Sequence, residues 1–166
     1  MPQFRHERHK SPSKLLHPRE LILALPPLRS KINLSRIVRT ASCCGVRRII
    51  TGGSTKLDPT IARDGVDQVE IESRRSLLPV LKKLKQNGYQ IVGLEQTTNS
   101  ENLHTFQFAR KSVFVIGHER QGLTEDVLAV LDNVIEIPVY GLPYSYNVAT
   151  AASMALYEYC RQYPDG

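Results

Sequence analysis

Residues 113–127 read VFVIGHERQGLTEDV, and the rest of the chain is best understood from this stretch. The run VFVIG is rich in β-forming residues without strict alternation of apolar and polar side chains, which is typical of a strand buried on both faces. A loop with two glycines follows, and Thr124 and the two acids after it then open a short helix. A buried strand that leads through a loop into a helix is the repeating unit of a parallel α/β sheet.

Similar runs recur on both sides of this segment. We expect further strands in LILAL (21–25), VRRIIT (46–51), VEIE (69–72), YQIVGL (89–94) and VIEIP (134–138). Such sheets bind ligands beyond the carboxyl ends of their strands. We therefore expect the chemistry in the loops after Leu94, Ile116 and Ile137.

Between the expected strands lie segments in which apolar residues recur at the spacing of a helix. Apolar residues recur from Leu34 to Cys44 after a possible cap at Asn33, and Gly45 fits a left-handed stop. Leucines at 77, 78, 81 and 84 line a second helix that ends at Gly88, and a final helix is expected over 147–162. The prediction is an α/β fold with a mostly parallel sheet flanked by helices.

Composition narrows the class of protein. The 166 residues suit one domain, and we expect a flexible basic arm over 1–18 followed by a single domain over 19–166. The formal charge of +6 favours a polyanion such as nucleic acid as partner.

No apolar run is long enough to span a membrane and no secretory signal is evident, so we expect a cytoplasmic protein without a membrane partner. No metal site is predicted, since no cysteine or acidic ligand cluster supports His6 and His9.

Several familiar sites are missing from the sequence. The turn after the first strand reads PPLRSKIN and lacks the glycines of a dinucleotide-binding loop. GGSTK (52–56) superficially resembles a phosphate loop, but its spacing does not fit that motif. No nucleophile elbow is present either. Nucleotide hydrolysis and acyl transfer are therefore disfavoured.

Three segments carry polar residues suited to a site. In NLSRIVRTASCCG (33–45), Arg39 lies off the apolar stripe near the helix start, where it could hold a phosphate; the alternative is a helix cap followed by an arginine facing solvent. In the opening segment, Glu119 follows the strand end between Gly117 and Gly122; the alternative is a turn that merely needs glycine, which explains the glycines but not the whole spacing.

The third segment is IEIPVYGLPYSYNVATAASMALYEY (135–159). Ser145 and Asn147 stand at the mouth of a helix that begins with small residues, so that helix can pack closely against a backbone or a cofactor. Either residue alone is also explained as a helix N-cap.

Taken in this order, the three segments resemble the sequence motifs of the SPOUT superfamily, specifically the TrmH/SpoU-type RNA 2′-O-ribose methyltransferases. The resemblance covers about Leu21 to Tyr159, including GLEQT (93–97). It implies a C-terminal trefoil knot, S-adenosylmethionine as cofactor, tRNA or rRNA as substrate, and a homodimer in which Arg39 of one protomer reaches the cofactor site of the other.

The resemblance also assigns residues. The catalytic set that it implies is Asn33, Arg39, Glu119, Ser145 and Asn147. The cofactor-binding set that it implies is Leu94, Glu95, Gly117, Ile137, Pro138, Ser145, Tyr146 and Val148. Ser35, His118 and Tyr146 depart from the residues usual in relatives, and Tyr146 bears most directly on cofactor affinity.

We hypothesise that Arg39 grips the phosphate next to the target ribose and stabilises the alkoxide that develops during the transfer. A free guanidinium stays protonated far above neutral pH, which makes it a poor base. Ser145 and Asn147 would orient the ribose hydroxyl, and Glu119 would hold the loops. Two alternatives remain: a non-catalytic RNA-binding protein of the same fold, and a different nucleotide-using α/β enzyme.

Overall fold

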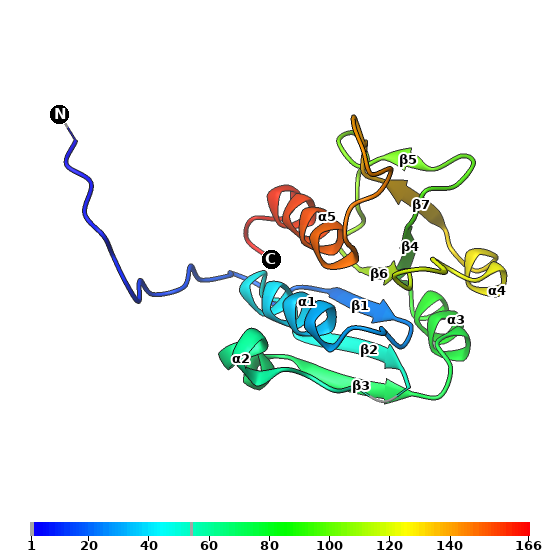
Figure 1. Ribbon diagram of the computed structural model, residues 1–166, viewed down its shortest axis with the longest axis horizontal. Helices are drawn as coiled ribbons and strands as arrows, with labels where there is room; N and C mark the ends of the chain where they lie inside the picture. Colours follow the sequence, from blue (N-terminus) through cyan, green and yellow to red (C-terminus); the bar gives the residue numbers. More distant parts are fainter. Residues whose placement is uncertain (1, 54) are drawn as a thin grey trace.

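The computed structural model describes residues 2–53 and 55–166, and within them the chain forms one seven-stranded sheet with helices on both faces (Figure 1). The strands are β1 (Leu21–Leu25), β2 (Arg48–Gly52), β3 (Glu70–Arg74), β4 (Gln90–Leu94), β5 (Glu101–Asn102), β6 (Ser112–Ile116) and β7 (Asn133–Glu136). The helices are α1 (Lys31–Cys43), α2 (Pro59–Ala62), α3 (Leu78–Gln86), α4 (Glu125–Leu128) and α5 (Val148–Gln162), with a 3₁₀ turn over Arg63–Gln68.

The sheet has the order β3-β2-β1-β6-β4-β7-β5, and each of the described pairings is parallel. This confirms the predicted parallel α/β sheet. All strands consequently end at the same edge, where the loops that follow them gather. The two-residue strand β5, the short helix α2 and the 3₁₀ turn were not expected from the sequence.

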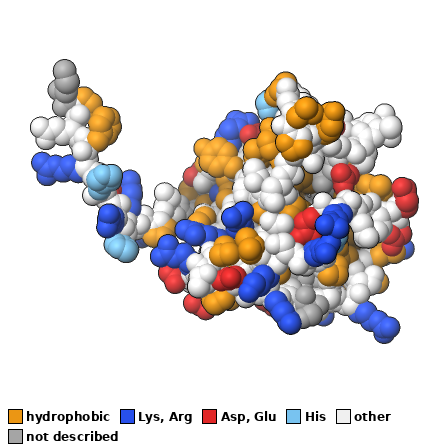
Figure 2. All heavy atoms as spheres, viewed as in Figure 1, with side chains coloured by type: hydrophobic (Ala, Val, Ile, Leu, Met, Phe, Trp, Pro, Cys, Tyr) orange, Lys and Arg blue, Asp and Glu red, His pale blue; other side chains and the backbone are white. Residues whose placement is uncertain are grey.

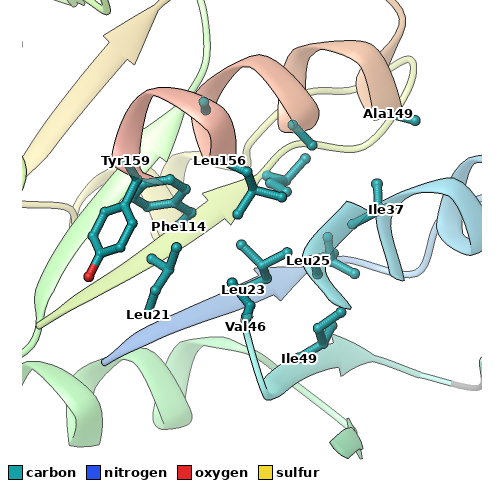
Figure 3. Close-up of a cluster of buried hydrophobic side chains, with 14 of the residues drawn as sticks. Leu21, Leu23, Leu25, Ile37, Val46, Ile49, Phe114, Ala149, Leu156 and Tyr159 are labelled. Carbon is teal, nitrogen blue, oxygen red and sulfur yellow. The ribbon is translucent and has the colours of Figure 1, made fainter. Parts of the chain in front are cut away.

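Strand β1 lies at the centre of the core because its side chains are buried on both faces. Leu21, Leu23 and Leu25 point into the layer between the sheet and helices α1 and α5 (Figure 3). Ile22 and Ala24 point the other way, into the cluster that α3 covers. This double burial explains why LILAL has no polar alternation.

Helix α1 begins three residues before the position expected. Ser30 is its N-cap, and the Ser30 side chain accepts a hydrogen bond from the Asn33 amide at 3.2 Å. The expectation that Asn33 caps this helix is therefore wrong, because the hydroxyl of Ser30 already satisfies an amide of the first turn and leaves the Asn33 side chain for other partners. The expected stop is confirmed, since Gly45 has a φ of +73°.

Helix α5 starts at the predicted place and closes the core. Asn147 is its N-cap, and Tyr159 is fully buried, in edge contact with the rings of Phe108 and Phe114. The Tyr159 hydroxyl donates to the carbonyl of Arg110. Burial raises the pKa of Tyr159 to about 12.

The N-terminal residues leave the body of the molecule as an extended arm (Figure 1). The arm is attached where the amides of Leu16 and His17 donate to the carbonyl of Asp165. Arg19 then donates to the carbonyls of Cys44 and Tyr163, the C-caps of α1 and α5. Within the described ranges, none of the helices is long and apolar enough to cross a membrane.

The hydroxyl of Tyr159 offers a test of the core. Tyr159→Phe leaves the Arg110 carbonyl without its donor, so we expect the free energy of unfolding to fall by about 1–3 kcal/mol. Tyr157→Phe is the matched control on the same helix, because Tyr157 is 73% exposed. Urea denaturation of both variants measures the difference. Equal stability of the two variants would contradict the packing described above.

Candidate functional site

A cavity of about 220 Å³ opens at the carboxyl ends of three neighbouring strands. We call it the β4–β6–β7 cavity. Its lining includes eight residues expected at the site: Leu94, Glu95, Gly117, Glu119, Ile137, Ser145, Tyr146 and Val148. Pro138 is not among the lining residues, although it follows Ile137 directly. The cavity thus lies at the strand ends where the sequence predicts the site.

Glu95 holds the glycine-containing loop against the end of β4. Its carboxylate accepts hydrogen bonds from the amides of Leu123 at 3.1 Å and Gln96 at 3.0 Å. A Cβ added at Gly122, where φ is +65°, would lie 2.2 Å from a Glu95 oxygen. A Cβ at Gly117 would lie 3.0 Å from the Gly122 backbone. The two glycines are therefore required by close packing within the loop.

Glu119 joins this loop to the start of α1. Its two carboxylate oxygens accept hydrogen bonds from the amides of Arg29 at 3.1 Å and Ser30 at 3.0 Å. Burial by itself would raise the pKa of Glu119, but these amide donors and the Asn33 side chain outweigh it and hold the pKa below its ordinary value. Glu119 is therefore an anion that organises the turn between β1 and α1.

Asn33 connects the three segments. Its Nδ2 donates to Glu119 Oε1 at 3.3 Å, and its Oδ1 accepts from Nδ2 of Asn147 at 3.2 Å. The Oδ1 of Asn147 in turn accepts from the Ala149 amide at 2.9 Å and caps α5. A continuous chain of hydrogen bonds thus runs from the loop after β6, through α1, to the start of α5.

The loop before α5 forms the outer wall of the cavity. Ser145, Tyr146 and Asn147 are exposed, and Tyr146 is 40% accessible. Gln96 Nε2 donates to the Tyr144 carbonyl at 3.2 Å, which ties this loop to the one after β4. The hydroxyl of Ser145 is thus presented at a wall that solvent and a ligand can both reach.

Arg39 lies apart from the cavity in a single chain. It is exposed on α1 and lines a different depression together with Arg36, Thr40 and Thr150. The hydroxyls of Thr40 and Ser153, which line the same depression, approach to 3.1 Å and join α1 to α5. Four of the five expected catalytic residues therefore meet within one chain, and Arg39 does not join them there.

Other residues contribute in ways that the sequence did not predict. Ser35 is fully buried, donates to the Lys31 carbonyl at 2.7 Å and accepts from the Asp58 amide at 2.7 Å, so it anchors the segment before α2 to α1. The backbone of Arg29 and Ser30 holds Glu119 through amides, which no side-chain pattern reveals. His118 Nε2 lies 3.5 Å from Glu119, and its Nδ1 accepts from the Arg120 amide.

The chemistry of the cavity combines apolar walls with negative charge. Leu94, Ile116, Ile137 and Val148 provide surface for a flat or aliphatic group, and three carboxylates, of Glu95, Glu119 and Glu136, outnumber the one guanidinium of the lining, that of Arg120. Such a lining suits a ligand that carries a heterocycle and a positive charge.

Comparisons with known proteins agree with this geometry. Residues 20–157 match the family model described as the SpoU rRNA Methylase family. A tRNA (guanosine(18)-2′-O)-methyltransferase of Aquifex aeolicus is 30% identical over 148 residues, which cover 87% of this chain and 70% of that protein. The 23S rRNA (guanosine-2′-O-)-methyltransferase RlmB of Acinetobacter baylyi is 31% identical over 148 residues, covering 86% of this chain and 60% of that one.

Solved structures match the same fold. The A. aeolicus TrmH/SpoU tRNA modifying enzyme superposes with a TM-score of 0.85 at 29% identity, over 91% of this chain and 79% of that one. An AdoMet-bound rRNA methyltransferase of Sinorhizobium meliloti has a TM-score of 0.69 at 26% identity, over 92% of this chain and 61% of that one. The chain thus spans roughly two thirds of the length of these relatives and belongs to the SpoU rRNA methylase family.

Proposed function

We propose that this chain transfers a methyl group from S-adenosylmethionine to a ribose 2′-hydroxyl of tRNA or rRNA. The observation that carries the proposal is the hydrogen-bonded chain Glu119–Asn33–Asn147, which brings the three segments together beside one cavity. The named activities of the relatives supply the reaction, and the cavity supplies the place for it.

The cavity fits the cofactor. Leu94, Ile137 and Val148 would hold the adenosine part through apolar contacts. The carboxylates of Glu95 and Glu119 favour a cation nearby. Gly117 also lines the cavity, where its backbone would be available to polar groups of the ligand. When bound, S-adenosylmethionine supplies an electrophilic methyl group.

The residues around the cavity would position the acceptor. Ser145, exposed at the cavity wall, would hydrogen-bond to the ribose hydroxyl, and Asn147 would fix the start of α5 beside it. Glu119 acts as a positioning residue, because its carboxylate is fully engaged with the turn before α1. Placement of this kind accounts for much of the rate of a transfer reaction.

Arg39 would act across a homodimer. In one chain it lies outside the β4–β6–β7 cavity, so its contribution requires a second copy that presents α1 to the cavity of the first. Exposed apolar side chains support such an interface: Ile32 is 43% accessible on α1, and Tyr140 and Leu142 are 87% and 77% accessible in the loop before α5. From the partner, the Arg39 guanidinium would grip the phosphate beside the target ribose and stabilise the developing alkoxide.

Three further features belong to the same proposal. The segment after β7 would form the trefoil knot, which the contact between the loops after β4 and before α5 supports. The arm carries Arg5, Arg8, Lys10 and Lys14 and would track RNA phosphates. The protein would act in the cytoplasm, on RNA that is present there.

Methyl transfer can be tested directly, with Arg39 as the probe. Incubation with methyl-labelled S-adenosylmethionine and unmodified cellular RNA should label one ribose, which nucleotide mapping then identifies. Arg39→Ala should lower turnover by at least a hundredfold while calorimetric affinity for the cofactor stays within about twofold. Arg75→Ala, an exposed arginine before α3, is the control and should retain activity.

Equal loss of turnover and cofactor affinity in a folded Arg39→Ala protein would refute this role. Absence of cofactor binding by the unsubstituted protein would favour the non-catalytic RNA-binding alternative.

Glu119 gives a prediction with a defined pH dependence. Glu119→Gln replaces an acceptor oxygen by a donor facing backbone amides, so we expect a loss of about 1–3 kcal/mol in unfolding free energy at pH 7 and weaker cofactor binding. Because folding lowers the pKa of Glu119, its contribution is complete above the pKa of the unfolded state and is lost as the pH falls through the folded value. The stability difference between the two proteins should therefore shrink in acid, whereas exposed Glu70→Gln should differ little at any pH. A difference that persists unchanged at low pH would contradict the role of the carboxylate.

If the basic arm contacts RNA phosphates, it should contribute to the salt dependence of RNA affinity. Deleting residues 2–14 should reduce the slope of log affinity against log salt by about 0.7 to 0.9 for each phosphate that the arm neutralises in the intact protein. Filter binding of an unmodified tRNA transcript at several salt concentrations measures the slope. An unchanged slope would exclude the arm from RNA binding.

A further inference from the structure

A second cavity, of about 340 Å³, lies at the ends of β1 and β2. We call it the β1–β2 cavity. Pro26 and Pro27 come from the turn after β1, Thr51 from the end of β2, and Lys56 from the loop that follows β2. None of its lining residues also lines the β4–β6–β7 cavity. It therefore lies on the same edge of the parallel sheet but forms a separate site.

The walls of this cavity carry an excess of positive charge. Arg29, Lys31 and Lys56 all line it. Lys31 Nζ is 3.9 Å from a carboxylate oxygen of Asp58, whereas Arg29 and Lys56 form no ion pair within residues 2–53 and 55–166. Figure 2 shows Lys and Arg side chains distributed over the face of the molecule that carries α1 and α2. Cations gathered in a concave, partly apolar site favour an anionic ligand.

Thr51 supplies an independent observation. It lines the cavity and is only 2% exposed, yet its hydroxyl is the one buried side-chain oxygen or nitrogen in the described part of the chain that has no hydrogen-bond partner. Buried polar groups are almost always paired, and an unpaired one costs about 1–3 kcal/mol. A ligand oxygen in the cavity would provide the missing partner.

The cavity wall is held in shape by close packing. A Cβ added at Gly52 would lie 3.2 Å from Pro27 Cδ, and one at Gly53 would lie 3.3 Å from Pro27 Cγ. Gly53 also has a φ of +86° and donates to the Arg74 carbonyl at 2.7 Å. The glycines of the GGSTK segment thus let two prolines pack directly on the loop, although the segment does not have the spacing of a phosphate loop.

We propose that the β1–β2 cavity binds a backbone phosphate of the RNA substrate, with Arg29 and Lys56 as charged contacts and the Thr51 hydroxyl as donor. This rests on the proposed function, because RNA is the anion that such an enzyme must hold. The lining has no aromatic residue on which a base could stack, so the cavity suits the phosphodiester group rather than a nucleoside.

The position of Arg29 gives this subsite a role in catalysis. Its amide donates to Glu119 at 3.1 Å while the residue also lines the β1–β2 cavity. Arg29 would therefore contact the phosphate and also donate its amide to Glu119, the first residue of the hydrogen-bonded chain Glu119–Asn33–Asn147 beside the methyl-transfer site. Binding of RNA would fix the β1–α1 turn and present a neighbouring ribose to the cofactor.

Two substitutions separate this proposal from a structural role for the same residues. Thr51→Val keeps the shape and removes the unpaired hydroxyl, so the fold should be as stable or more stable, while affinity for an unmodified tRNA transcript falls about tenfold. Lys56→Gln should reduce the slope of log affinity against log salt by about 0.7 to 0.9, the value for one phosphate. Lys82→Gln, exposed on α3, is the matched control and should leave the slope unchanged.

Further measurements distinguish the possible outcomes. Calorimetry with S-adenosylmethionine should give the same affinity for all four proteins, which tests the methyl-donor site independently of the RNA subsite. Unchanged RNA affinity and salt slope in both Thr51→Val and Lys56→Gln would overturn the proposal, even if methyl transfer is demonstrated. A second experiment compares inorganic phosphate with the RNA. Each is titrated into the protein, and the NMR amide resonances of Thr51 and Gly52 are followed. Shifts with free phosphate but none with the RNA would also overturn it, because the cavity would then hold a free anion.

Discussion

The carboxylate of Glu119 accepts hydrogen bonds from the amides of Arg29 and Ser30 and from the side chain of Asn33. These donors belong to the turn before α1 and to its first turn, whereas Glu119 follows β6, almost ninety residues later. Asn33 extends the contact to Asn147 at the start of α5. The geometry of both cavities depends on this one half-buried acceptor, because without it two backbone amides and the loop opposite would lose their common partner.

The parallel sheet explains why such a contact is possible. Since every described strand pairing is parallel, the loops after β1, β2, β4, β6 and β7 all lie at one edge. Glu119 stands between two cavities there: an apolar, acidic one suited to the methyl donor and a basic one suited to a phosphate. The two cavities share no lining residue, but they are connected by the hydrogen bond from the amide of Arg29, which lines the basic cavity, to Glu119, which lines the acidic one.

The sheet could be predicted because LILAL and VFVIG are continuously apolar, a pattern that burial on both faces requires. The loops of the candidate site could be located for the same reason, since parallel strands place their carboxyl ends together. The cap of α1 was predicted wrongly, because Ser30 and Asn33 are both good caps and only the tertiary partner Glu119 decides between them. The separation of Arg39 from the cavity could not be read from spacing within one chain, and the unpaired Thr51 hydroxyl is visible only once its surroundings are known.

Arg19 stands where the arm meets the body and donates to the last carbonyls of both α1 and α5. The opposite ends of these two helices carry Asn33 and Asn147, whose side chains are hydrogen-bonded to each other. Under the proposed function, an RNA bound to the arm would therefore be connected to both helices, through the Arg19 guanidinium and through the bonds of Leu16 and His17 to Asp165. The two helices would thus transmit a displacement of the arm over roughly twenty ångströms, at about 1.5 Å per helical residue, to the Asn33–Asn147 pair.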